Sequence, residues 1–382
     1  MVQDLPDSTM NKLMFLDACE CHFSESFDRS RSKDDIDNCV LANRLILQLI
    51  KAEMNVSGKF LDVPGLTLAE GNQLKGNMSK SVPNLHCVKN ATFDIHPQFP
   101  FCLNRIGVVL ALRFDEIGNL EDIMEAISLQ HQVVQLTPEG NPYMPKYLAD
   151  LGSSLQCQFL YTGEVTDISD AISFLKKAVQ LTSEVHPSRP MHLSVLGRVL
   201  QHRFTYIGKF KDIVNAISFQ QKAIPVTPEG NPYRPKCLAA LGKSLQNRFT
   251  YSGQITDISE AITFQQKAIQ LTPKDHPSRP MYLANLGSSF HHQFMHTRKL
   301  TDISEAISLL QKAVQLTSDG HPYMPIYLSD LGKSFLYQFI HFGEVRNLSD
   351  AISFQQRAVQ LTPEGHPFKP VYLSNLGNSL QH

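Results

Sequence analysis

The chain has 382 residues, of which 42% are hydrophobic and 19% charged, and its 35 Lys and Arg against 36 Asp and Glu give a formal charge of −1. This apolar composition excludes global disorder, and the near-neutral charge argues against a partner found mainly by charge, such as a nucleic acid. No apolar run reaches the about 18 residues of a membrane-spanning helix, and residues 1–17 contain no secretory core. We therefore expect a soluble, cytoplasmic protein.

The seven cysteines are odd in number and unevenly spread, as is typical of reduced thiols. Cys19 and Cys21 are followed by His22, but only one residue separates the two cysteines, whereas zinc pairs have two to four. No second pair follows. The sequence therefore predicts no metal and no cofactor.

The first quarter of the chain is irregular. After a tail at residues 1–12, residues 13–54 place apolar side chains at helical spacing twice, which predicts a divergent helical pair. Residues 55–95 contain several glycines and prolines that break any helix, so we expect an irregular linker there. It remains open whether this stretch is a degenerate repeat, a loop or an error of the gene model.

A period of 45 residues organises residues 96–382. Two markers repeat at this step, an alanine followed by isoleucine and a glycine preceded by leucine or isoleucine. The alanines are Ala126, Ala171, Ala216, Ala261, Ala306 and Ala351, and the glycines are Gly107, Gly152, Gly197, Gly242, Gly287, Gly332 and Gly377. A shared period over this length indicates an array of one repeated unit.

Each unit contains two predicted helices. In helix A, which begins near Pro145, apolar residues recur at intervals of three and four. Gly152 lies within this helix and weakens it, so we expect a second helix to cross closely there. Helix B is predicted to begin at Asp167, whose side chain would cap its free amides. Residues 137–142, with Pro138, Gly140 and Pro142, end helix B and lead to the next unit. One such pair buries too little apolar surface to fold alone, so the units must stack as a solenoid.

These residues resemble the tetratricopeptide signature. The likeness lies in a shared set of small and apolar positions, namely Leu148, Leu151, Gly152, Leu155, Ala171 and Ala178, with Pro138, Pro228, Pro273 and Pro363 after helix B. Leucine replaces the signature tryptophan, and the unit exceeds the usual length of about 34 residues. This longer form resembles the expanded arrays of mushroom-forming fungi, which often precede a caspase-like CHAT protease domain. The resemblance implies an all-α α-solenoid of antiparallel helix pairs, a right-handed superhelix of six complete units and a terminal unpaired helix.

The last predicted helix A has no helix B to cover Leu373, Leu376 and Leu380. We expect either that the natural product continues or that this end binds another molecule, for example by end-to-end association.

Catalytic patterns are weak. Gly242, Lys243 and Ser244 resemble the end of a phosphate-binding loop, but the first glycine of that motif is missing. His202 and His292 lie on alternate helices, too far apart to share a zinc ion, and the same distance argument excludes Cys157 and His202 as nucleophile and base. We expect no catalytic residue and no enzymatic activity.

The resemblance places helix A along a concave groove, and the polar residues there vary between units. These candidate protein-binding residues are Lys146, Asp150, Ser153, Gln156, Arg198, Gln201, His202, Lys243, Gln246, Asn247, Asn285, His291, His292, Asp330, Lys333 and Tyr337. The sequence therefore predicts a non-enzymatic scaffold that binds a peptide or protein segment, with no nucleic acid and no membrane as partner. Three alternatives stay open: drift on a solvated face, a plain structural spacer, and the sensor array of a CHAT protease.

Overall fold

The computed structural model describes residues 33–56 and 99–382, apart from residue 367. These residues form fourteen helices and no strand. The first is α2 (Lys33–Val56). The A helices are α3 (Phe99–Ile117), α5 (Met144–Thr162), α7 (Arg189–Ile207), α9 (Arg234–Ser252), α11 (Arg279–Thr297), α13 (Met324–Phe342) and α15 (Lys369–Leu380). The B helices are α4 (Leu120–Leu136), α6 (Val165–Leu181), α8 (Phe210–Ala223), α10 (Ile255–Gln270), α12 (Leu300–Gln315) and α14 (Val345–Gln360).

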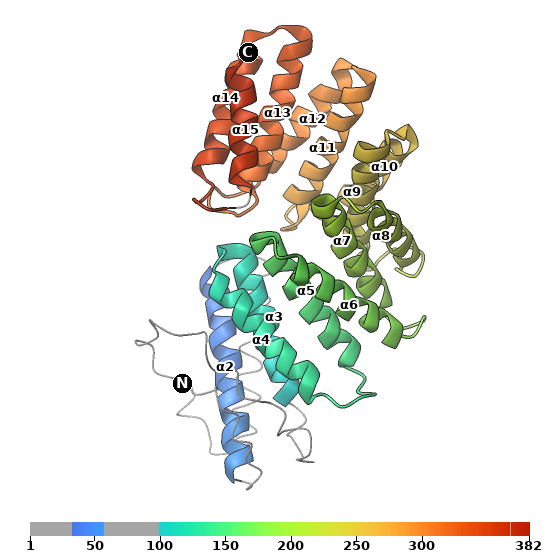
Figure 1. Cartoon of the computed structure of the whole chain (residues 1–382), viewed down its shortest axis with the longest axis vertical. Coiled ribbons are helices and arrows are strands. Elements are labelled where there is room, and N and C mark those ends of the chain that lie inside the picture. Colours follow the sequence, from blue (N-terminus) through green and yellow to red (C-terminus); the bar gives the residue numbers. More distant parts are fainter. Residues whose placement is uncertain (1–32, 57–98, 367) are drawn as a thin grey trace.

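The helices form a solenoid. From α5 to α13, each A helix packs on its own B helix and, on the other side, on the B helix of the preceding unit, whereas α3 packs on α2 and α15 on α14. Successive A helices also touch. Figure 1 shows the hairpins following one another along a curved path from α3 to α15. The predicted all-α solenoid of antiparallel helix pairs is confirmed.

The repeat glycine is the point of closest approach within a hairpin. A Cβ built on Gly152 would lie 2.7 Å from the Leu175 side chain and 3.1 Å from the carbonyl oxygen of Ala171. Ala171 is fully buried at this crossing. The predicted close crossing of a second helix is confirmed, and it explains why glycine and alanine share one period.

The prediction that Asp167 caps helix B is wrong. Helix α6 begins at Val165, Glu164 occupies the N-cap, and no side chain bonds there. Asp167 therefore lies inside the first turn, where an aspartate can face helix A instead of the free amides. In three other hairpins the equivalent aspartate meets an arginine, and these hairpin ion pairs are Arg113–Asp122, Arg203–Asp212 and Arg248–Asp257, with contacts of 2.6 to 2.8 Å.

Polar side chains fix the linkers between hairpins. Asn141 Oδ1 accepts a hydrogen bond of 2.9 Å from the backbone N–H of Tyr143, and His321 Nδ1 accepts one of 3.1 Å from Tyr323. Several histidines therefore hold turns, as asparagines do at the same place in other units.

Helix α2 covers the open side of the first hairpin. Ile36, Cys39 and Val40 are buried in the core that it shares with α3. The guanidinium of Arg113 also contacts Asp37 at 2.9 Å. The helix predicted before α2 and most of the predicted linker at 55–95 lie outside the described residues.

The curved array returns to its own beginning. The Tyr323 hydroxyl, just before α13, donates a hydrogen bond of 3.1 Å to Asp115 near the end of α3. Just before α15, the His366 ring lies 6.1 Å from that of Tyr161 and the Phe368 ring 6.3 Å from that of Tyr206. Figure 1 shows α13 to α15 beside α3 to α5. We call these three contacts the closing contacts.

Candidate functional site

The candidate site is the inward side of the A helices, which we call the trough. In α5 to α13 the residue that follows the repeat glycine marks the trough, and these residues are Ser153, Arg198, Lys243, Ser288 and Lys333, of which Ser288 is buried. The glycine before each of them faces helix B, so the next residue, about 100° further around the helix, can face away from the hairpin. Serines and cations therefore both occur along the trough, in the order Ser, Arg, Lys, Ser and Lys.

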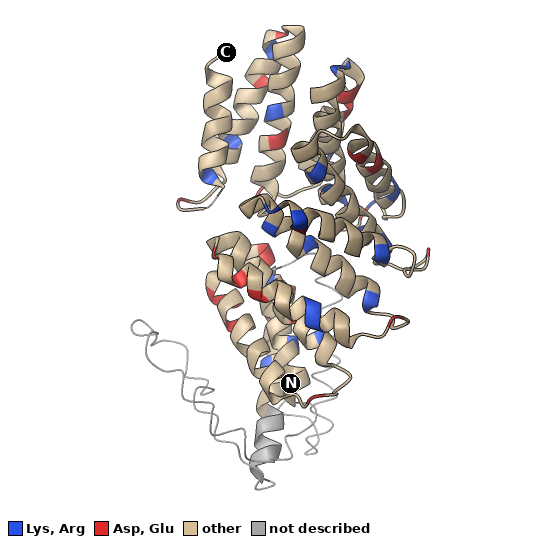
Figure 2. Ribbon diagram, turned by 45° about the vertical axis from the view of Figure 1, so that its right-hand side comes forward, with Lys and Arg blue, Asp and Glu red and all other residues tan. Residues whose placement is uncertain are grey.

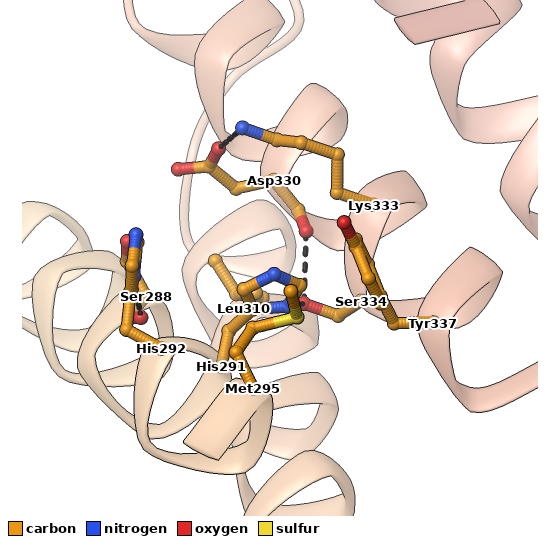
Figure 3. Close-up of a pocket in the computed structure, with 9 residues that line it drawn as sticks. All are labelled: Ser288, His291, His292, Met295, Leu310, Asp330, Lys333, Ser334 and Tyr337. Carbon is orange, nitrogen blue, oxygen red and sulfur yellow. Dashed lines mark hydrogen bonds and ion pairs between the residues drawn. The ribbon is translucent and has the colours of Figure 1, made fainter. Parts of the chain in front are cut away.

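A pocket of about 240 Å³ opens in the trough between α11 and α13. Figure 3 shows His291, His292 and Met295 on one wall and Asp330, Lys333 and Tyr337 on the other. Lys333 Nζ contacts Asp330 Oδ1 at 2.7 Å. Burial raises the pKa of Asp330, but Lys333 and Lys243 outweigh it and lower that pKa overall. The pocket therefore contains an ionised carboxylate whose charge Lys333 already balances.

The pocket histidines are uncharged. His291 Nδ1 lies 3.1 Å from Ser334 Oγ, and His292 Nδ1 lies 2.7 Å from the carbonyl oxygen of Ser288. Burial lowers the pKa of His291 to about 3 and lowers that of His292. Because His292 Nδ1 must donate to a carbonyl, its neutral ring leaves Nε2 as an acceptor. The wall can therefore accept as well as donate hydrogen bonds.

Arg198 lies on α7 and Lys236 and Lys243 lie on α9, and we call these three cations the basic triad. None of them forms an ion pair within the described residues. Burial and the charge of Arg198 lower the pKa of Lys236, and burial also lowers the pKa of Lys243, with Asp330 and Lys333 acting on it in opposite directions. His202 lies beside the triad, and burial with the charges of Arg198 and Lys243 lowers its pKa to about 3.

The first closing contact lies beside the triad. Asp115, which accepts the hydrogen bond of Tyr323, also acts electrostatically on Lys236. Its charge, together with burial, raises the pKa of Tyr323 well above the ordinary value. Burial raises the pKa of the Cys157 thiol to about 12, so this cysteine is a protonated, weak nucleophile.

The structure separates the sixteen predicted residues into three groups. Three are buried between helices, namely Gln156, Gln201 and Gln246. Four contact a side chain of a neighbouring helix, namely Asp150, Asn247 and His291 through hydrogen bonds and His292, whose Nδ1 lies 3.1 Å from Gln246 Nε2. Nine are partly or fully exposed along the A helices, namely Lys146, Ser153, Arg198, His202, Lys243, Asn285, Asp330, Lys333 and Tyr337. The three glutamines are therefore poorly placed to contact a ligand.

Sequence reasoning missed Lys236, Asp115 and Tyr323. Lys236 lies 90 residues after Lys146, so comparing alternate units would have found it. Asp115 and Tyr323 are 208 residues apart in the chain, and no local pattern connects them.

Within residues 33–56 and 99–382, no three His, Cys, Asp or Glu side chains come together as metal ligands would. Among the helices of the same residues, none is long and apolar enough to cross a bilayer.

Comparison with known proteins gives likenesses of fold. No protein-family model matches the sequence, and no curated protein matches it significantly. Among solved structures, a Podosopora anserina protein of nearly identical TPR-like repeats shares 17% identity, with a TM-score of 0.40 over 56% of this chain and 97% of that one. In the Cut9–Hcn1 complex of the APC/C, the match is 17% identical, with a TM-score of 0.48 over 98% of this chain and 60% of that one. The human IFIT1 dimer with PPP-AAAA matches at 14% identity and a TM-score of 0.45, over 97% of this chain and 78% of that one.

Proposed function

We propose that this protein is a non-catalytic scaffold whose trough binds a segment of another protein. One observation carries the proposal: the residues packed within each hairpin repeat almost unchanged, whereas the residues of the trough differ from unit to unit. A Cβ placed on Gly152, Gly197 or Gly242 would lie 2.6 to 2.7 Å from a side chain of helix B in every case. The residues directly after these glycines are Ser153, Arg198 and Lys243.

A spacer would need only the packed positions. A polar surface with a different side chain at each step is suited to reading a sequence, because each unit contacts a different part of an extended partner. The pocket between α11 and α13 adds a concave place for one side chain of that partner. The trough offers no metal cluster and no activated nucleophile within the described residues, so binding rather than catalysis fits it best. A sensor array that acts with a caspase-like protease domain would use the same trough and stays an alternative.

Site-specific photo-crosslinking tests the proposal. A photoreactive amino acid replaces Ser153 in the trough or, as the matched control, Ser173, which is exposed on α6 of the same unit. We expect a protein segment to crosslink at position 153 and not at 173, and a synthetic copy of that segment to bind the purified chain. Equal crosslinking at both positions, or crosslinking at 173 alone, contradicts binding in the trough.

A further inference from the structure

The charge of the chain is unevenly distributed along the array. Residues 99–136, which form the first hairpin, contain two Arg and five Asp or Glu. Residues 189–270, which contain α7 to α10, have eleven Lys or Arg and four Asp or Glu. Figure 2 shows the acidic residues of the first hairpin and the basic residues of the middle of the array. Residues 189–270 are therefore strongly basic, although the formal charge of the whole chain is −1.

Inside the trough, Asp150 and Asp330 are already paired with lysines, whereas Arg198, Lys236 and Lys243 form no ion pair within the described residues. Asp150 bonds to Lys146 and Asn104, each at 2.7 Å, and Asp330 bonds to Lys333. Asp115 is the carboxylate that faces Lys236, and it already accepts the hydrogen bond of Tyr323. Arg198 and Lys243 are partly exposed and Lys236 is exposed, so the basic triad is an excess of positive charge that an anionic ligand can reach.

We propose that the trough binds an acidic segment of its partner protein, whose carboxylates pair with Arg198, Lys236 and Lys243. This inference rests on the proposed function and names the chemistry of the ligand. The cations come from two helices, and Arg198 and Lys243 occupy equivalent places on successive A helices, whose axes lie about 10 Å apart. A single small anion cannot contact both, whereas carboxylates spaced along one chain can.

The helix spacing also predicts the spacing of the acidic residues. A polyproline II segment has three residues per turn and rises about 3.1 Å per residue, so every third side chain points the same way at intervals of about 9 Å. This nearly matches the step between Arg198 and Lys243. We therefore expect acidic residues three apart in an extended segment.

A protein segment fits this trough better than a nucleic acid. The phosphates of a nucleic acid form a continuous line of negative charge. Such a line would meet repulsion from Asp115 near Lys236 and from Asp330 near Lys243, since these carboxylates act electrostatically on the two lysines. A peptide can instead place neutral residues opposite these aspartates and acidic ones opposite the triad.

Fluorescence anisotropy of labelled probes tests the proposal on the full chain. The probes are a peptide of four Glu-Pro-Pro repeats, the same peptide with Gln for Glu, and a single-stranded oligouridylate. We expect the Glu peptide to bind at least about tenfold more tightly than the Gln peptide in about 50 mM salt and to weaken in about 300 mM salt, because the ion pairs are partly exposed.

Matched variants locate the binding. Lys243→Met and Arg198→Met should each weaken binding of the Glu peptide about fivefold, since partly desolvated ion pairs contribute more than exposed ones. Lys243→Arg should retain it. The control is Lys267→Met, which removes an exposed cation of α10 in the same unit. Circular dichroism should show each variant folded, because no triad residue forms an ion pair within the described part of the chain.

Four results would overturn the inference. Equal binding of the Glu and Gln peptides, or no binding of either, would mean that the ligand is not acidic. Tighter binding of the oligouridylate would identify a nucleic acid as the partner. An equal loss for Lys267→Met and Lys243→Met would show unspecific attraction. Crosslinking at position 153 to a neutral segment would reject the acidic ligand while leaving the proposed function intact.

Discussion

The two faces of α9 differ in whether their cations form ion pairs. On the face toward α10, Arg248 bonds to Asp257 at 2.7 Å through two nitrogens, and hydrogen bonding to Asp257 raises the pKa of Arg248. On the trough face of the same helix, Lys243 has no ion-pair partner within the described residues. A buried charge must be paired for the hairpin to form, whereas a charge in the trough can stay unpaired until a ligand binds. Pairing therefore distinguishes cations that build this fold from cations that are available to bind.

The largest effect should come from breaking the ion pair on the side of helix A that packs against helix B, which we call the packed face. Arg248→Met leaves Asp257, which is only 3% exposed on its side chain, as an unpaired charge. We expect a loss of about 3 kcal/mol in the free energy of unfolding, the lower end of the usual range because the Arg248 side chain is 25% exposed. Urea denaturation measures the loss, and hydrogen exchange should locate it in α9 and α10.

The sixth hairpin supplies the control for this prediction. There Gln338 and Asn347 occupy the two places of the hairpin ion pair, so both members are uncharged. The double variant Arg248→Gln, Asp257→Asn should therefore recover most of the stability. A double variant as unstable as Arg248→Met would show that shape, and not the stranded charge, causes the loss.

A second effect on the packed face is steric. A Cβ on Gly242 would lie 2.6 Å from the Gln265 side chain and 3.0 Å from the carbonyl oxygen of Ala261, so Gly242→Ala must push α10 away. We expect a loss of about 2 kcal/mol, as is usual for overpacking. The matched control is Gly377→Ala in α15, where nothing lies within 4 Å and alanine should stabilise the helix by about 1 kcal/mol. Two equal losses in thermal denaturation would contradict the close-crossing explanation.

These contrasts also show which features sequence alone could reveal. The close crossing was predictable, because a helix-weakening glycine and a small alanine at one fixed period require contact between two helices. The role of Asp167 was predicted wrongly, because an aspartate that caps helix B and an aspartate that pairs with an arginine of helix A both lie near the start of helix B. A difference of one turn in where helix B begins decides between these two roles, and sequence patterns do not predict helix ends with that precision.

The trough was predictable only in part. Residues directly after the repeat glycine, such as Arg198 and Lys243, lie in it, whereas residues four places after the glycine, such as Gln156 and Gln246, are buried between helices. The basic triad was not expected, because a formal charge of −1 averages the acidic first hairpin with the basic middle. The closing contacts depend on the curvature of the whole array, which sums small rotations at every interface and leaves no mark in any single unit.

The closing contact beside the triad should have a smaller effect than either packed position. Tyr323→Phe removes the hydroxyl that bonds to Asp115 but keeps the ring. The tyrosine is 40% exposed, so we expect a loss of about 1 kcal/mol. Hydrogen exchange should quicken in the linker before α13 and remain unchanged in α9 and α10. Unchanged exchange in that linker would mean that the hydroxyl does not hold the two ends together.

The smallest effect tests the second hairpin, in which a glutamine replaces the arginine that pairs with the aspartate in other hairpins. In the second hairpin Gln158 stands where Arg113, Arg203 and Arg248 stand in others, and burial, with help from Glu164 and Asp170, raises the pKa of Asp167. Because the folded state holds this proton more tightly than the unfolded state, the carboxylate destabilises the fold once the pH exceeds the folded pKa. Asp167→Asn should therefore stabilise the protein by about 0.5 kcal/mol or less at neutral pH, and the gain should vanish as the pH falls below the ordinary range of a carboxyl group. Thermal denaturation across this pH range measures the difference. Asp257→Asn, which removes the partner of Arg248, should instead destabilise at neutral pH. A loss of stability for Asp167→Asn as well would mean that the Asp167 carboxylate has a favourable partner in the folded state.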